Sequence, residues 1–169
     1  DEKGAVMSVR DIFASMDYGP APESATEALD WIRGHGGRFG CFVDGRFQHE
    51  GAVFETRNPA TGAVLAEVAQ GTGADVEAAV AAARRAFGRW SKTSGAERAR
   101  VLYALGRLVQ KNARLFAVLE TLDNGKPIRE SRDIDLPLVA RHFGYHAGLA
   151  QLIEEEAPCM VPHGVCAAV

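Results

Sequence analysis

Hydrophobic positions along this chain change their spacing near residue 70. Before that point, short apolar stretches alternate with polar residues, which is typical of β-strands. In residues 41–47, two apolar arms flank Asp44-Gly45, a pair that favours the positive φ angles of a tight hairpin turn. Residues 54–57 and 64–68 flank a second turn-rich sequence, Asn58-Pro59-Ala60-Thr61-Gly62. The sequence therefore predicts two consecutive β-hairpins.

One helix is predicted before the hairpins and another directly after them. Ser24-Ala25-Thr26-Glu27 matches a capping box, in which the serine hydroxyl accepts a hydrogen bond from a free backbone amide and the glutamate reaches back. A glycine-rich stretch at 34–37 ends that helix. After the hairpins, apolar residues recur every three or four positions from Val76 to Trp90, behind a cap at Thr72. We expect this second helix to be amphipathic and packed on its apolar face.

Further helices are expected up to residue 152. Another capping box, Ser94-x-x-Glu97, opens a helix with an apolar stripe formed by Val101, Leu102, Leu105, Leu108 and Val109. Helical spacing continues until Gly125-Lys126-Pro127 and resumes over about 135–152. Residues 160–169 are apolar and interrupted by a proline, which indicates strand material. The elements together predict an α/β fold made of helices and β-hairpins.

Composition and charge narrow the classes of partner. Hydrophobic residues make up 47% of the sequence and charged residues 24%, which is enough apolar material for a sizeable core. The net charge of −3 gives no basic field for nucleic acid or anionic lipid, so a small-molecule or protein partner is favoured. No uncharged apolar stretch approaches the ~18 residues that span a bilayer. Since no signal peptide is visible either, we expect a cytoplasmic protein without a membrane contact.

The cysteines and the last residues add two expectations. Cys41, Cys159 and Cys166 are an odd set without paired spacings, which favours reduced thiols. Cys166 has only small apolar neighbours, which supply neither a base nor a positive charge, so a buried strand cysteine is favoured over a nucleophile. The apolar run at 164–169 predicts an incomplete chain whose last strand lacks partners.

Three patterns suit ligand chemistry, and each has a structural alternative. Gly71-x-Gly73 precedes a helix as in dinucleotide loops, but Val76 replaces the third glycine and a plain helix cap is favoured. His142 and His146 have the i, i+4 spacing of zinc ligands, yet no third ligand accompanies them and packing is favoured. Asp123-Asn124-Gly125-Lys126-Pro127 favours a helix C-cap, in which Gly125 supplies a positive φ and Lys126 complements the helix dipole. Only Asp123 is left unexplained, because it stands at the unfavourable end of the dipole, where its side chain could hold a turn or a cation.

The order of the motifs is more specific than any one of them. They are the Asn58–Gly62 turn, the D-V-x-x-A-V-x-A-A-x-x-A-F-x-x-W helix ending at Trp90, Arg98, the Glu120–Pro127 sequence, and Pro162-x-Gly164-Val165. In this order they resemble the N-terminal part of the aldehyde dehydrogenase superfamily. Residues 11–23 resemble the extension of its family-sixteen branch, whose members carry a second, dehydrogenase-like domain. The resemblance implies a helical extension over 1–40 and, over 41–169, a truncated cofactor and oligomerisation domain with an incomplete Rossmann-like sheet.

The resemblance also implies a chemistry. Members of the family oxidise an aldehyde to a carboxylic acid with NAD or NADP, through a cysteine thiolate that attacks the carbonyl and a glutamate that activates water. None of these catalytic residues matches a position in this chain, and Cys166 matches a strand position and not the nucleophile. Val169 matches the start of a strand that lines the cofactor's adenosine side, so it carries over as a cofactor-binding residue.

Two further properties carry over from the resemblance. Thr56, Arg57 and Asp123 match positions that bind a monovalent cation in some members, although Arg57 replaces a usually apolar residue. The two hairpins and the tail at 159–165 match bridging and oligomerisation elements, which implies a homo-oligomer such as a dimer. We therefore expect the N-terminal portion of an NAD(P)-dependent aldehyde dehydrogenase that acts on a small-molecule aldehyde and is inactive by itself.

Two other functions stay open at this point. The first is a non-catalytic, aldehyde-dehydrogenase-like scaffold that acts through protein–protein contacts, because members of the family-sixteen branch can lack the nucleophile. The second is a free-standing helical binding module of 169 residues. The residue at the nucleophile position in the continuing reading frame separates the enzyme from the scaffold.

Overall fold

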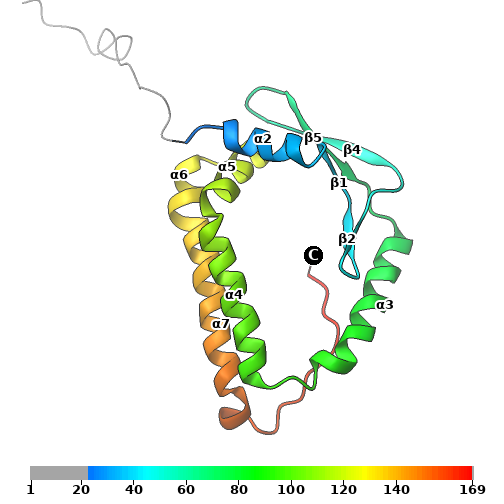
Figure 1. The fold of residues 1–169 in the computed structure, drawn as a ribbon, viewed down its shortest axis with the longest axis vertical. Helices are drawn as coiled ribbons and strands as arrows, with labels where there is room; N and C mark the ends of the chain where they lie inside the picture. Colours follow the sequence, from blue (N-terminus) through cyan, green and yellow to red (C-terminus); the bar gives the residue numbers. More distant parts are fainter. Residues whose placement is uncertain (1–22, 169) are drawn as a thin grey trace, which may run out of the picture.

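The structure is a computed structural model and describes residues 23–168. Its elements form an open ring (Figure 1). Helix α2 (Thr26–Gly34) and a three-stranded sheet lie at one end, and α3 (Gly73–Trp90) forms one side. Helices α4 (Gly95–Lys111) and α7 (Leu136–Glu156) run together along the other side. This mixture of helices and sheet confirms the predicted α/β class.

Both predicted hairpins are present. β4 (Val53–Arg57) pairs antiparallel with β5 (Val64–Ala69), and β2 (Cys41–Val43) pairs antiparallel with β3 (Arg46–Gln48). The Asp44-Gly45 turn between β2 and β3 has φ angles of 54° and 77°. These are the left-handed conformations that the two residue types favour, so the turn forms for the predicted reason.

Strand β1 (Arg38–Phe39) was not expected from the sequence. It pairs in parallel with β5, with Phe39 opposite Val68, and gives a sheet of order β1-β5-β4. A strand of two residues is too short to show an alternation of apolar and polar positions, so the pattern carried no signal for it. Its pairing fixes the α2–β1 segment on the edge of the second hairpin.

Capping boxes begin two long helices as predicted. At the start of α3, the Asp75 carboxylate accepts from the Thr72 amide at 2.7 Å, and the Thr72 hydroxyl accepts from the Asp75 amide at 3.4 Å. The 94–97 box at α4 makes the same exchange. The capping box expected at Ser24 is wrong, because its hydroxyl accepts from the Thr26 amide at 3.2 Å, two positions on instead of three.

The chain between α4 and α7 is more broken than its apolar spacing predicts. Helix α5 (Ala113–Asn124) ends at Gly125, which has a φ of 79°. A short α6 (Ile128–Glu130) and a π-helical turn, η1 (Ser131–Asp135), then lead directly into α7. The helix expected over 135–152 is therefore confirmed, although it begins one residue later and extends further at its C-terminal end.

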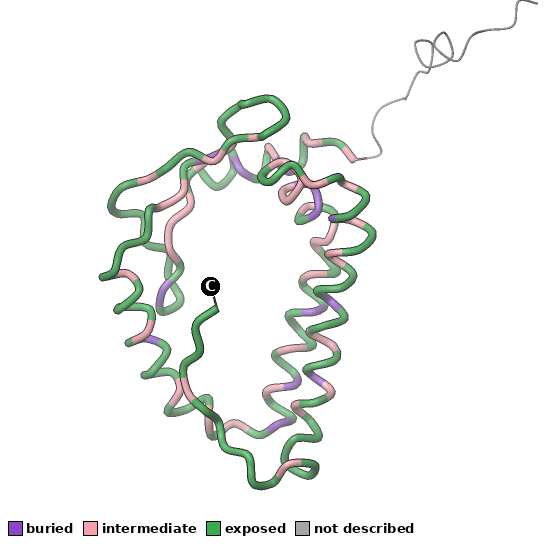
Figure 2. The backbone as a smooth tube through the Cα atoms, turned by 180° about the vertical axis from the view of Figure 1, so that it is seen from behind, coloured by how far each residue is buried: buried purple, intermediate pink, exposed green. Residues whose placement is uncertain are grey.

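Small residues hold α4 against α7. Ala99 and Ala147 are fully buried, and a Cβ added to Gly106 would lie 3.3 Å from the Cβ of Phe143. The apolar stripe of α4 noted in the sequence is largely exposed, at 45% for Val101, 40% for Leu105 and 54% for Leu108. Small side chains let the two backbones approach closely, so the buried surface is a narrow line along the pair (Figure 2).

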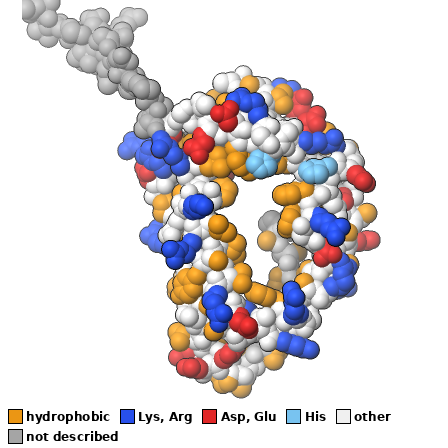
Figure 3. Space-filling view, in the orientation of Figure 1, with side chains coloured by type: hydrophobic (Ala, Val, Ile, Leu, Met, Phe, Trp, Pro, Cys, Tyr) orange, Lys and Arg blue, Asp and Glu red, His pale blue; other side chains and the backbone are white. Residues whose placement is uncertain are grey.

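The prediction that α3 packs on its apolar face is wrong for the described residues. Ala82 is buried, whereas Val76 and Trp90 are 62% and 45% exposed. Hydrophobic side chains gather around the central opening of the ring (Figure 3). Within residues 23–168, β2 contacts α3 but leaves most of the apolar face of α3 uncovered.

The described part of the tail forms no strand, contrary to the prediction for residues 160–169. Met160 and Val161 are 72% and 84% exposed. Cys166 is exposed as well, so the prediction of a buried strand cysteine is wrong. A strand needs a neighbour to pair its backbone amides and carbonyls, and no other strand pairs with the tail among the described residues.

Candidate functional site

A cavity of about 700 Å³ lies between α2, the sheet, α5 and the first turns of α7. Most of its wall is apolar or aromatic, with contributions from Trp31, Ile32, Phe39, Phe116, Leu119 and Leu136. The polar residues of the wall are Thr56, Glu120, Asp123, Lys126, Asp135 and His142. A cavity of this volume with an apolar wall and few polar groups is typical of a small-molecule site.

Two of the three residues matched to a cation position meet at this cavity. The hydroxyl of Thr56, on β4, donates a hydrogen bond to the carboxylate of Asp123, at the end of α5. The third residue, Arg57, turns its side chain elsewhere, since it pairs with Glu55 and donates to the Gly62 carbonyl at 3.0 Å. The Thr56 contact explains why a carboxylate stands at the negative end of a helix dipole.

The two turn motifs that flank this pair touch each other. A Cβ added to Gly125 would lie 2.8 Å from Cγ of Pro59. Gly125 has the left-handed conformation expected of a C-cap, and the Lys126 amide donates to the Asn124 side-chain oxygen at 2.8 Å. The C-cap interpretation of this sequence is therefore confirmed, and the cap also fits against the turn at Pro59.

Lys126 carries its charge at the edge of the cavity. Its ammonium donates a hydrogen bond to Asp135 and lies 3.9 Å from the Glu120 carboxylate. The hydrogen bond to Asp135, followed by attraction to these carboxylates, raises the pKa of Lys126 above its ordinary value. The lysine therefore stays protonated and ties the end of α5 to η1.

The two histidines singled out by their spacing do lie together on α7. The ring centroids of His142 and His146 are 6.4 Å apart, and Tyr145 packs edge-on against His146. His142 faces the cavity. No group of three or more His, Cys, Asp or Glu side chains with metal-binding geometry occurs within residues 23–168, so the described structure adds no third ligand to the pair.

Among the described residues, the other candidates from the sequence do not line the cavity. At Gly71-x-Gly73, the Asp75 carboxylate accepts from the Thr72 amide and the Thr72 hydroxyl accepts from the Asp75 amide, which confirms the helix-cap alternative. Cys166 is exposed, its thiol lies 3.9 Å from the Gly164 carbonyl, and it is not part of the cavity wall. Val169, the predicted cofactor-binding residue, lies outside the described residues.

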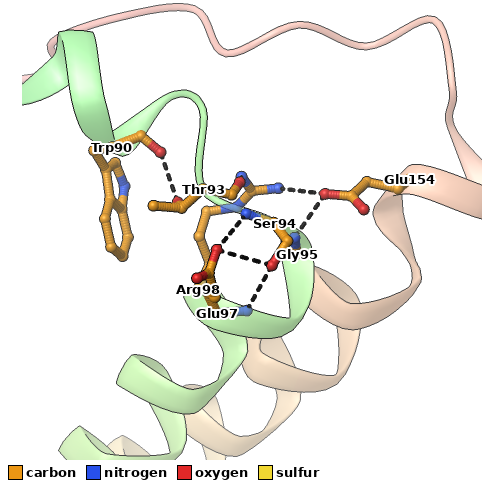
Figure 4. Close-up of polar contacts among 7 residues, drawn as sticks. All are labelled: Trp90, Thr93, Ser94, Gly95, Glu97, Arg98 and Glu154. Atoms are coloured by element: carbon orange, nitrogen blue, oxygen red, sulfur yellow. Dashed lines mark hydrogen bonds and ion pairs between the residues drawn. The ribbon is translucent and has the colours of Figure 1, made fainter.

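A polar cluster at the far end of the ring joins α3, α4 and α7 (Figure 4). The Gly95 amide donates to the Glu154 carboxylate at 2.6 Å. Arg98, one of the motif residues, donates to the Thr93 carbonyl and lies 3.6 Å from the same carboxylate. The hydroxyl of Thr93 donates to the Trp90 carbonyl at 2.7 Å. This arrangement gives Arg98 a structural role, because it fixes the turn between two helices.

The aromatic wall of the cavity is the part that sequence reasoning missed. Trp31 and Phe39 stack with their ring centroids 5.5 Å apart and an angle of 8° between the ring planes. They come from α2 and β1, and the short β1 had no sequence signal. The i, i+4 spacing of Trp31 and His35 was a usable signal for one face, since these rings pack at 4.1 Å.

Comparisons with known proteins agree on one family. A family model described as the aldehyde dehydrogenase family matches residues 47–169. Aldehyde dehydrogenase family 2 member B4 of Arabidopsis thaliana, a mitochondrial protein, is 47% identical over 116 residues, which are 68% of this chain and 21% of that protein. The chain spans about a fifth of the length of the curated relatives it matches.

Solved structures give the same result. The NAD+ complex of an aldehyde dehydrogenase from Bacillus cereus is 36% identical, with a TM-score of 0.65, and the match covers 79% of this chain and 26% of that one. HpcC from Thermus thermophilus is 33% identical with a TM-score of 0.70, over 78% of this chain and 27% of that one. The described ring therefore has the fold of one part of these larger proteins.

Proposed function

Because the chain belongs to the aldehyde dehydrogenase family, we propose that it is the N-terminal portion of a protein that oxidises aldehydes to carboxylic acids with NAD or NADP. The observation that carries the proposal is the family match over residues 47–169, within which the turn motifs around Pro59 and Gly125 contact each other. The partial coverage of every relative compared supports assigning the catalytic steps to a longer protein.

The cofactor of the proposed enzyme is a nicotinamide dinucleotide, which accepts the hydride of the aldehyde. The support is a relative, the Bacillus cereus enzyme, whose structure is an NAD+ complex. We assign Val169 to the adenosine side of that cofactor, as the sequence resemblance implies. The described residues would supply scaffold to such a site: the sheet, the capped start of α3, and the α4–α7 pair that stands opposite it.

We further propose a division into an extension over 1–40 and a cofactor and oligomerisation domain over 41–169. The extension is assigned to the family-sixteen branch on residues 11–23, of which only Glu23 belongs to the described residues. The start of the family match at residue 47 supports a boundary near the first hairpin. Helix α2 and strand β1 then belong to the extension and dock on the family part through β5.

The proposed partners are an aldehyde and a second copy of the protein. A homodimer is supported by the β2–β3 hairpin, which leaves Phe42 and Phe47 62% and 59% exposed on a short two-stranded sheet with open edges. We place the protein in the cytoplasm, as expected from its sequence. No helix among residues 23–168 is both long and apolar enough to cross a membrane.

The test of this function uses the complete protein that carries this chain. Its continuing reading frame is expected to encode a cysteine at the nucleophile position, and the purified protein is expected to form reduced nicotinamide only when an aldehyde and NAD+ or NADP+ are both present. Alkylation of cysteines should abolish the reaction. A different residue at the nucleophile position, together with no turnover of a panel of aliphatic and aromatic aldehydes, would support the scaffold instead.

A further inference from the structure

The α4–α7 helix pair carries a positive charge that nothing in the pair balances. Over residues 98–119 and 136–153, the sequence has six lysine and arginine residues and no aspartate or glutamate, in a chain whose net charge is −3. The six are Arg98, Arg100, Arg107, Lys111, Arg114 and Arg141. Lysine and arginine side chains are visible on this flank of the ring (Figure 3). The flank therefore has a positive field that the net charge of the whole chain does not show.

Three of these residues form a line along α4, which we call the basic stripe: Arg100, Arg107 and Lys111. Arg100 and Arg107 directly follow Ala99 and Gly106, which are buried along the contact with α7. A step of seven residues is close to two helical turns, so both arginines leave α4 on the same side of that contact. All three residues of the stripe are exposed, and within residues 23–168 none has a carboxylate oxygen within 4.0 Å of its side-chain nitrogens.

Arg141 of α7 lies on the same side as the basic stripe. It precedes Gly148 by seven positions, and a Cβ added to Gly148 would lie 4.0 Å from the hydroxyl of Tyr103 on α4. Because Tyr103 is three or four positions from each arginine of the stripe, these side chains share one side of α4. Arg141 is exposed and also has no carboxylate within 4.0 Å among the described residues. It adds a fourth positive charge beside the stripe.

The end of the basic stripe already holds a carboxylate. Arg114, three positions after Lys111, donates to one oxygen of Glu23 at 2.5 Å, and Arg132 donates to the other oxygen at 3.3 Å. The Glu23 side chain is only 10% exposed, and it comes from a segment 91 positions away from Arg114. The planar fork of an arginine matches the two oxygens of a carboxylate. This flank therefore binds an acidic side chain from a distant part of the chain.

From these observations we infer that this side of the α4–α7 pair is a docking surface for an acidic helix of another protein. Arg100 and Arg107 repeat along α4 at about 10.5 Å, the rise of seven helical residues. A helix that lies alongside α4 repeats its glutamates at the same distance when they are seven positions apart. Each carboxylate of such a helix can then meet one arginine. The inference goes beyond aldehyde oxidation, because it uses none of the residues that line the cavity.

The surface suits a protein better than a nucleic acid. The phosphates of a DNA strand are about 3.4 Å apart along its axis, which does not match the repeat of the stripe. Tyr103 and Tyr145 stand beside the cations and are 43% and 64% exposed. Tyrosine is enriched in the surfaces through which proteins contact each other. A partner helix would meet both the positive charges and these two rings.

The test uses the complete protein that carries this chain. Its probe is a fluorescein-labelled helical peptide with glutamates at seven-residue steps, and binding is measured by fluorescence polarisation. We expect saturable binding that weakens as the salt concentration rises, because salt screens exposed charges. A peptide with glutamine in place of each glutamate should bind about tenfold more weakly. A peptide with the same glutamates spread around the helix should also bind more weakly, since only some of them can face the stripe.

A matched pair of variants locates the binding. R100Q/R107Q/K111Q removes the basic stripe and should lower the affinity for the acidic peptide about tenfold. The control R84Q/R89Q/K92Q also removes two arginines and one lysine, all exposed, from α3 and the residues that follow it on the other side of the ring. The control should leave the affinity unchanged. Circular dichroism checks that both variants keep the helical content of the unaltered protein.

Four results would overturn the inference. The acidic peptide gives no saturable binding, the glutamate and glutamine peptides bind equally, or the two triple variants lose affinity equally. The fourth is tighter binding of a single-stranded DNA oligonucleotide that the stripe variant abolishes, which would make the stripe a nucleic-acid surface. The first two results are decided on the unaltered protein, so the test survives a failure of either variant to fold.

Discussion

The Thr56 hydroxyl donates a hydrogen bond to the Asp123 carboxylate and so joins β4 to the end of α5 across 67 positions of sequence. The turns next to these residues also touch, through Pro59 and Gly125. A carboxylate at the C-terminus of a helix is unfavourable by itself, because the helix dipole is negative there. The contact with Thr56 compensates for that placement and makes one structural unit of two distant motifs.

The Thr56 contact predicts a coupling between two substitutions. T56V and D123A should each lower the free energy of unfolding of the chain by about 1 kcal/mol, because each removes one partner of a hydrogen bond to a charged group. The double variant should lose clearly less than the sum of the two. Urea unfolding of the four proteins measures the coupling, and strictly additive losses would show that the two residues act independently.

The α4–α7 contact predicts opposite effects for the same substitution at two glycines. A Cβ at Gly95 would lie 2.1 Å from the Ala150 carbonyl oxygen, so G95A should lower the free energy of unfolding by about 1–3 kcal/mol. At Gly88, near the C-terminal end of α3, an added Cβ meets nothing within 4 Å. G88A should therefore raise stability by about 0.5–1 kcal/mol. Thermal unfolding compares them, and equal effects of the two variants would refute the close approach.

The capping box at α4 predicts an acid-sensitive contribution to stability. Hydrogen bonds from the Ser94 amide and hydroxyl lower the pKa of Glu97 below its ordinary value of 4.5. Since the folded pKa is the lower one, the stabilisation is complete above 4.5 and is lost as the pH falls through the folded pKa. The difference in unfolding free energy between the parent chain and E97Q should shrink over that range. A difference that stays constant into acid would contradict this assignment.

The buried hydroxyl of Ser131 in η1 predicts that its removal does not lower the free energy of unfolding. Its side chain is fully buried, and its hydroxyl has no hydrogen-bond partner among the described residues. S131A should leave the free energy of unfolding unchanged or raise it by up to about 1 kcal/mol, since it removes an unpaired polar group. S131V, which adds volume at the same place, should lower it by about 1–3 kcal/mol. A loss in S131A as large as that in S131V would show that the hydroxyl is bonded.

Local signals in the sequence predicted most of the elements. The Asp44-Gly45 hairpin and the caps at Thr72 and Ser94 depend on residues within three positions of each other, so the sequence contains the whole interaction. The capping box predicted at Ser24 was wrong although it is equally local, because a serine hydroxyl can instead accept from the amide two positions on. The family was identified from the order of the motifs, which resembles their order in known proteins.

Packing was harder to predict than the elements. The stripe that includes Leu105 reads as a helix contact face, but the contact with α7 is made by smaller residues such as Ala99 and Gly106. Apolar spacing shows which face of a helix is apolar and does not show what packs against that face. The cavity was missed for a related reason, since Trp31 and Asp123 line the same cavity only because β1 pairs with β5.

The measurement that most directly tests the proposed role of this chain is the stoichiometry of aldehyde oxidation. The complete protein and the 169-residue chain are assayed side by side for reduced nicotinamide and for carboxylic acid. We predict one reduced cofactor for each acid formed by the complete protein, and neither product from the chain alone. Formation of both products by the chain alone, or of neither by a folded complete protein, would contradict its role as the N-terminal portion of an aldehyde dehydrogenase.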